Sequence, residues 1–237
     1  LAAGPTQPGA QRERLTMNSH DGNNHMLSTT PLRLYLEENL LLSLPALQVA
    51  PGEVLTLMGP SGCGKSSLLA ALAGVLPASA PIRLEGDVTL DARRLTQLPP
   101  QARRIGMLFQ DDLLFDHLTV AENLMFGMLA SLKGHRARRE KAVAALAQVD
   151  LTSQADKLPG ALSGGQKARV SLLRVLLAEP EALLLDEPFS RLDKPLRAAF
   201  RELVFAQIKA LAIPAILVTH DEDDAPGTIL QLTESCF

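Results

Sequence analysis

The chain has 237 residues, of which 46% are hydrophobic and 21% are charged, and its net charge is -3. This length allows one large domain or two small ones with a real core. The small net charge gives no general reason to expect nucleic acid or an anionic membrane as a partner. The two cysteines, Cys63 and Cys236, are not placed like a disulfide framework, which favours a reducing compartment.

The first segment, residues 1–30, is polar, rich in Gly and Pro, and without hydrophobic periodicity. We expect it to be disordered, or to derive from outside the natural chain. Residues 31–237 are expected to form a single domain. No apolar run approaches the roughly 18 residues needed to span a bilayer. Any membrane role is therefore expected to act through another chain.

Apolar runs separated by Gly and Pro predict short strands along the rest of the chain. Strands are predicted at residues 33–36, 46–50, 53–58, 87–90, 104–109, 182–186, 215–219 and 228–232. Helices are predicted at residues 65–75, 120–148, 165–178 and 195–211. Strands that alternate with helices predict an α/β fold, with a mostly parallel sheet covered on both faces.

The middle of the chain, between Phe109 and about Gly165, interrupts this alternation and is expected to be a helical insertion. Within it lies the charged run KGHRARREK, residues 133–141. Basic runs can bind nucleic acid, but this one has no interleaved aromatic residues. We therefore interpret it as a solvated helix face.

One loop has a phosphate-binding pattern. Gly59–Ser66, GPSGCGKS, matches G-x-x-x-x-G-K-[ST], with a buried strand before it and a helix after it. The glycines let the backbone wrap a phosphate, and the helix offers free N–H groups. Lys65 would reach the β- and γ-phosphates, while the Ser66 hydroxyl would bind Mg²⁺.

Polar side chains follow three of the apolar strands, where ligands of open α/β sheets bind. Asp186 and Glu187 end LLLDE, so Asp186 could hold Mg²⁺ and Glu187 could polarise a water. The alternative is a plain strand end before a turn. His220 and Gln110 end two further strands. The His220 imidazole could donate to the γ-phosphate or orient the water, and the Gln110 amide could touch Mg²⁺ or the attacking water. Taken alone, either could simply face solvent.

A second candidate anion site lies about a hundred residues after the first. The SGGQ stretch, Ser163–Gln166, opens a predicted helix, so its backbone N–H groups form a small nest for an anion. The residues themselves do not explain why one chain of this size carries two such sites.

Taken in chain order, GPSGCGKS, FQ, LSGGQ, LLLDEP, SRLD and TH resemble the ATP-binding subunit of ABC transporters over about residues 32–220. The resemblance implies a P-loop NTPase fold of ABC type, with an antiparallel β part near the N-terminus. It places the core at about residues 31–110 and 168–237, and a helical subdomain at about residues 111–167. ATP and Mg²⁺ are the implied cofactors.

The family pattern carries over onto individual residues. ATP-contacting positions are Gly59, Pro60, Ser61, Gly62, Cys63, Gly64, Lys65, Ser66, Ser67, Ser163, Gly164, Gly165, Gln166 and Asp193. Implied metal ligands are Ser66, Gln110 and Asp186; Glu187 is the implied general base, with His220, Gln110 and Lys65 assisting. Tyr35, the only tyrosine, is the candidate for stacking on adenine, although the register there also allows a leucine or no aromatic partner.

The resemblance also implies partners. Two subunits stack head to tail, so that the SGGQ of one covers the ATP held by the other. The stretch FQDDLLFDHLTVAENL, residues 109–124, is similar to that of importers for small solutes. Its residues Leu113, Leu114 and Phe115 could receive a transmembrane permease, or could be ordinary buried residues. A periplasmic solute-binding protein and a cytoplasmic, membrane-peripheral location would follow from import.

Three alternatives remain open at this point: the ATPase of an ABC exporter, a non-transport ABC-type ATPase, and a phosphate-loop kinase. The spacing from Gln110 to Ser163 leaves no place for a long coiled coil of the kind found in chromosome-associated members. A kinase would give SGGQ no role.

Overall fold

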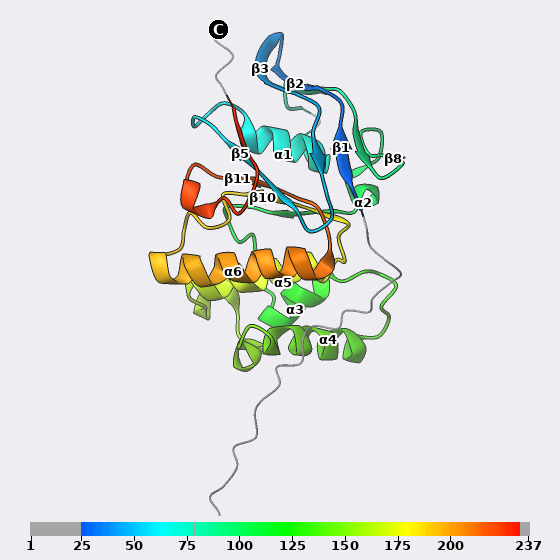
Figure 1. Ribbon diagram of the computed structural model, residues 1–237. Helices are drawn as coiled ribbons and strands as arrows, with labels where there is room; N and C mark the ends of the chain where they lie inside the picture. Colours follow the sequence, from blue (N-terminus) through cyan, green and yellow to red (C-terminus); the bar gives the residue numbers. More distant parts are fainter. Residues whose placement is uncertain (1–24, 78, 233–237) are drawn as a thin grey trace, which may run out of the picture.

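The computed structural model describes residues 25–77 and 79–232. At its centre lies a five-stranded parallel sheet with strand order β12-β5-β11-β10-β9 (Figure 1). Its strands are β5 (Val54–Met58), β9 (Ile105–Leu108), β10 (Ala182–Asp186), β11 (Ala215–Val218) and β12 (Ile229–Gln231). All four pairs of neighbouring strands in this sheet are parallel, as the apolar runs predicted.

Helices cover both faces of this sheet because successive side chains of each strand point to opposite faces. In β10, Leu184 packs into the cluster that contains α1 (Lys65–Ala73), whereas Leu183 packs into the cluster with α5 (Gly164–Leu176) and α6 (Lys194–Leu211). Figure 1 shows α1 on one side of the sheet and α5 and α6 on the other. The predicted α/β fold with a mostly parallel sheet is confirmed.

Two antiparallel sheets lie beside α1, as the family resemblance implied. One has strand order β4-β1-β7-β8 and the other β3-β2-β6. Their strands are β1 (Leu27–Thr29), β2 (Leu32–Leu36), β3 (Asn39–Leu44), β4 (Gln48–Val49), β6 (Ile82–Glu85), β7 (Val88–Leu90) and β8 (Arg93–Arg94).

The expected disorder over residues 1–30 is wrong for β1. Leu27 and Thr29 are buried, and β1 pairs with both β4 and β7. A strand of three residues is too short for hydrophobic periodicity to reveal. The expectation for residues 1–24 lies outside the described residues.

Strand β3 was not predicted either. It forms a hairpin with β2 through a turn in which Glu37 has a φ of 54°, without the Gly or Pro that usually signals such a turn. Strands β6 and β8 and the short helix α2 (Pro100–Arg103) were also missed.

The helix predicted at residues 120–148 is two helices, α3 (Val120–Gly127) and α4 (His135–Ala147). Arg138 stabilises the break between them, since its guanidinium donates to the carbonyls of Met125 and Leu132. The charged run is therefore not simply a solvated face. Two 3₁₀ turns follow, Thr152–Gln154 and Pro159–Ala161.

The helices α3 and α4 share a second core with α5, because Val170 and Leu173 of α5 belong to their cluster. The limits of 111–167 for a helical subdomain therefore stay a prediction. Within the described ranges, no helix combines the length and apolarity required to cross a membrane.

The central sheet provides a matched pair of isoleucines for a stability test. Ile216 in β11 is fully buried, whereas Ile229 in β12 is 41% exposed. Ile216→Ala should lower the free energy of unfolding by about 2–5 kcal/mol, because it leaves a cavity between two covered faces. Ile229→Ala should cost less than about 1 kcal/mol. Urea unfolding measures both, and equal losses would contradict this packing.

Candidate functional site

The parallel register brings three strand ends to one level of the sheet. Leu57 of β5 pairs with Val218 of β11, and Val218 in turn pairs with Asp186 of β10. The loops that follow these strands therefore leave from the same edge, which is where open α/β sheets bind ligands. They carry the phosphate-binding pattern, Glu187 and His220.

The Gly59–Ser66 loop has a backbone that requires glycine. Gly62 and Gly64 have φ values of 84° and 94°, in the left-handed region. A Cβ on Gly59 would come within 2.9 Å of the Leu232 side chain. The loop therefore follows a tight path from β5 into the free N–H groups of α1, as the pattern predicted.

Lys65 and Ser66, the first two residues of α1, point into the loop and toward β10. The Lys65 ammonium donates to the carbonyls of Gly59 at 2.8 Å and Pro60 at 2.6 Å. The Ser66 hydroxyl donates to Asp186 Oδ1 at 2.9 Å. A phosphate enclosed by this loop would compete for the same ammonium.

Asp186 is the buried carboxylate of this group. Burial raises its pKa, and neighbouring Glu187 raises it further, while the hydrogen bond from Ser66 and the charge of Lys65 act in the opposite direction. A cation held between the Ser66 and Asp186 oxygens would stabilise the ionised carboxylate. Two hard oxygen ligands of this kind fit Mg²⁺.

Glu187 and His220 contact each other directly at the same edge. His220 Nδ1 lies 2.7 Å from Glu187 Oε2. Glu187 has a φ of 47°, a conformation uncommon for a non-glycine residue, and its N–H donates to Val218 O at 2.9 Å. Such strain occurs at functional sites. The structure thus pairs the two side chains that the sequence placed on separate strands.

Gln110 follows β9 at this edge but is exposed. Within the described residues, no hydrogen bond joins its side chain to Ser66 or Asp186, so its metal role stays a prediction. The next two residues are anchored instead: Asp111 forms an ion pair with Arg191, and Asp112 O accepts from Ser171 Oγ of α5 at 3.0 Å. The sequence carries no signal for these contacts because the partners lie far apart in the chain.

The SGGQ stretch caps the N-terminus of α5. The Ser163 hydroxyl accepts from Gln166 N at 3.4 Å, and Gln166 Oε1 accepts from Ser163 N at 2.9 Å. Ser163 and Gly164 are exposed, and a Cβ on Gly164 would meet nothing within 4 Å. No hydrogen bond or ion pair among the described residues connects residues 163–166 with residues 59–66. This anion nest is open and separate from the loop.

Asp193 lies next to that nest. It caps α6 by accepting from Leu196 N at 3.0 Å, and the Leu196 side chain would be 3.2 Å from a Cβ on Gly165. The N-termini of α5 and α6 are therefore neighbours on the surface, and both expose a capping side chain.

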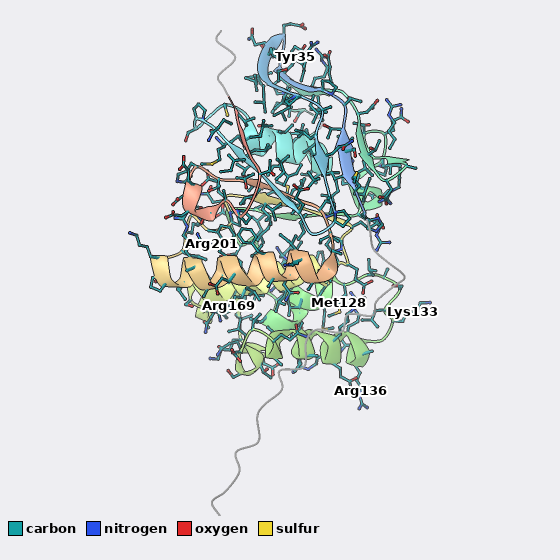
Figure 2. The ribbon with its side chains drawn as sticks, viewed as in Figure 1. Tyr35, Met128, Lys133, Arg136, Arg169 and Arg201 are labelled. Atoms are coloured by element: carbon teal, nitrogen blue, oxygen red, sulfur yellow. The ribbon has the colours of Figure 1, made fainter. Side chains whose placement is uncertain are left out.

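Tyr35 lies in the β2–β3 hairpin, at the opposite end of the molecule from Arg136 of α4 (Figure 2). Its ring stacks under the Arg83 guanidinium, which is 4.5 Å from the ring centroid. The side chains that would meet a Cβ on Gly64 are those of Leu34 and Leu41. Adenine stacking on Tyr35 stays a prediction, and the leucine alternative is the one that lies beside the loop.

A groove of about 370 Å³ opens between β9, α3 and α5. Its apolar lining includes Leu113, Phe115 and Phe126, and Arg174 borders it. Leu113 is 54% exposed and Phe126 66% exposed. Leu114 packs against the cluster of α3 and α4 instead. Two of the three predicted groove residues line this groove, and the third is an ordinary packing residue.

In a comparison with known proteins, residues 42–190 match the family model described as "ABC transporter". The chain is 48% identical over 202 residues to the uncharacterized ABC transporter ATP-binding protein YnjD of Escherichia coli, covering 85% of this chain and 92% of that protein.

The names of two further relatives state the solute that each imports. The thiamine import ATP-binding protein ThiQ of Shigella sonnei is 43% identical over 76% of this chain and 75% of its own length. The Fe(3+) ions import ATP-binding protein FbpC of Rhizobium etli is 40% identical over 76% of this chain, which spans 50% of that protein.

A thiol test probes the loop. Cys63 is partly exposed, and its Sγ lies 3.8 Å from the Lys65 ammonium. Alkylation with N-ethylmaleimide should abolish ATP turnover because it adds bulk inside the loop, and MgATP should protect. Cys63→Ala should stay active and resist the reagent. A fully active Cys63→Ala protein that remains sensitive would contradict the assignment.

Proposed function

The chain belongs to the ABC transporter ATP-binding family, and on that premise we propose that it hydrolyses MgATP as a head-to-tail dimer and powers a separate transmembrane permease. The observation that supports the dimer most strongly is the exposed SGGQ cap of α5, which has no link to the phosphate-binding loop of its own chain. A single chain therefore presents two half-sites.

The first half-site would bind the nucleotide and the metal. The Gly59–Ser66 loop and the N-terminus of α1 bind the phosphates, with Lys65 moving from the loop carbonyls to the γ-phosphate. Ser66 and Asp186 would hold Mg²⁺, which offsets the charge that develops on the phosphate oxygens. Gln110 joins this set as a proposed ligand of the metal.

Glu187 is the proposed general base. Its carboxylate lies beyond the end of β10, one residue after the metal-binding Asp186, and could accept a proton from water attacking in line. His220 contacts that carboxylate and orients it, since its Nδ1 lies 2.7 Å from Oε2. The imidazole is 61% exposed, so its free nitrogen is available to the γ-phosphate.

The second copy supplies the other half. The Ser163 hydroxyl and the N–H groups of Gly164 and Gly165 would cover the γ-phosphate held by the partner's loop. Two copies related by a two-fold axis form two such sites at once. Asp193, beside the nest, would lie at the interface between the two copies.

The proposed permease contact is the groove lined by Leu113, Phe115 and Phe126. Exposed aromatic and aliphatic side chains of this kind mark interaction surfaces. The relatives named for thiamine and Fe³⁺ import favour import here as well. The chain would then lie at the cytoplasmic face of the membrane, held by the permease, with a periplasmic solute-binding protein as a further partner.

A non-transport ABC ATPase and an exporter ATPase are the competing functions. The groove favours a transport partner, because an isolated ATPase would have no use for exposed Leu113 and Phe126. Co-purification with membrane fractions separates transport from the soluble alternative. A neighbouring gene for a periplasmic binding protein would separate import from export.

The assignment of Glu187 as general base predicts that its replacement traps the ATP-bound dimer. Glu187→Gln should bind MgATP, hydrolyse it at least about 100-fold more slowly, and accumulate as an ATP-bound dimer, since the proton acceptor is lost while the binding groups remain. Glu222→Gln, an exposed acid in the neighbouring loop, is the matched control and should behave as wild type. Turnover and analytical ultracentrifugation measure both variants. A Glu187→Gln protein that stays monomeric with ATP, or keeps its turnover, would overturn the mechanism.

The exposed SGGQ cap of α5 predicts a variant that binds ATP but does not hydrolyse it. Ser163→Arg should leave ATP binding by its own Lys65 loop unchanged but abolish hydrolysis, because the long side chain blocks the nest that faces the partner's ATP. Ser153→Arg, at another exposed serine of the helical region, should keep full activity. Nucleotide binding and turnover are measured side by side. Loss of ATP binding in Ser163→Arg would mean that the two anion sites belong to one chain.

A further inference from the structure

The loop that carries His220 is tied to α6 by two arginines one helical turn apart. Arg197 Nε donates to Asp224 Oδ1 at 2.9 Å, and Arg197 Nη2 lies 2.7 Å from Asp221 Oδ2. Arg201 Nη1 lies 3.5 Å from the same Asp224 Oδ1. Figure 2 shows Arg201 on the part of α6 that lies beside this loop.

Asp224 is the buried member of this network. Its side chain is 2% exposed, whereas those of Arg197 and Arg201 are 22% and 29% exposed. A carboxylate removed from water to this extent requires cationic partners and hydrogen bonds. Its second oxygen also lies 3.3 Å from Thr219 Oγ1. The position of the loop is therefore set by α6.

The His220 side chain itself makes few contacts that would fix its position. Its imidazole is mostly exposed, and its one hydrogen-bonding side chain among the described residues is Glu187. The residues on either side are the anchored ones. Thr219 Oγ1 donates to Asp224 and accepts from Asp221 N at 3.2 Å. The placement of the imidazole therefore depends on the backbone that these contacts fix.

We propose that Asp224, through Arg197, is a positioning residue that sets His220 against Glu187 for hydrolysis. This inference rests on the proposed ATPase function. Among the described residues, no hydrogen bond or ion pair joins Asp224 or Arg197 to the Gly59–Ser66 loop, so nucleotide binding should not depend on them. Arg197 lies one turn after Asp193, the cap beside the SGGQ nest. The helix α6 therefore connects the proposed interface between the two copies to the loop that carries His220.

The chain offers a matched control for the loss of such a carboxylate. Glu181 also binds two arginines, Arg93 and Arg104, but it precedes β10 at the opposite end of the sheet from His220. Glu181→Gln removes the same kind of charge network without touching the histidine loop. Its comparison with Asp224→Asn separates an effect on His220 from a general loss of ion pairing.

The first experiment compares ATP binding and single-turnover hydrolysis in full-length protein. Asp224→Asn should hydrolyse about 10- to 100-fold more slowly, as expected for a misplaced reacting group. Its affinity for ATP should stay within twofold of wild type, and Glu181→Gln should match wild type in both. Equal slowing in Glu181→Gln, or loss of ATP binding in Asp224→Asn, would overturn the proposal. Arg197→Lys should show a smaller defect of the same kind, and serves if Asp224→Asn does not fold.

The second experiment is a double-mutant cycle with His220→Ala. If Asp224 acts through the histidine, Asp224→Asn should change the residual rate of His220→Ala by less than twofold. The same slowing in both backgrounds would overturn the positioning role while leaving the ATPase function intact. A wild-type protein that does not hydrolyse ATP would instead overturn the proposed function, and this inference with it.

Discussion

The site depends on the parallel register of three buried strands. Leu57, Val218 and Asp186 lie side by side across β5, β11 and β10, so the loops after these strands begin at one level. Both faces of the sheet are covered by helices, and shifting one strand by a residue would exchange the side chains that pack into the two cores. Core packing thus fixes the distances between Ser66 and Asp186 and between Glu187 and His220.

The same packing separates the two anion sites. The glycine loop leads into α1 on one face of the sheet, whereas the SGGQ cap begins α5 on the other. The second site is directed at solvent, and under the proposed function a second copy of the chain would meet it there. The contact between Gly165 and Leu196 places α6 beside that nest, and Arg197 extends α6 to the histidine loop.

The closeness of Asp186, Glu187 and His220 could be predicted from the sequence because each ends or follows a buried apolar run, and strand ends of a parallel sheet share an edge. Contacts between distant residues could not be found this way. Arg138 caps a break inside a predicted helix, Arg191 pairs with Asp111, and Arg197 pairs with Asp224. An arginine gives no sequence signal for its partner. Strand β1 was missed because three residues carry no period.

The proposal that two chains share each ATP site is tested most directly by mixing two variants that are expected to be inactive, Lys65→Ala and Ser163→Arg. In a head-to-tail dimer of one of each, one site keeps an intact loop and faces an intact SGGQ cap, while the other site carries both defects. The account predicts that the mixture regains single-turnover hydrolysis that neither protein shows alone. If mixed dimers form, as mass photometry of a size-tagged chain can verify, and hydrolysis stays absent, the two anion sites do not act across the interface.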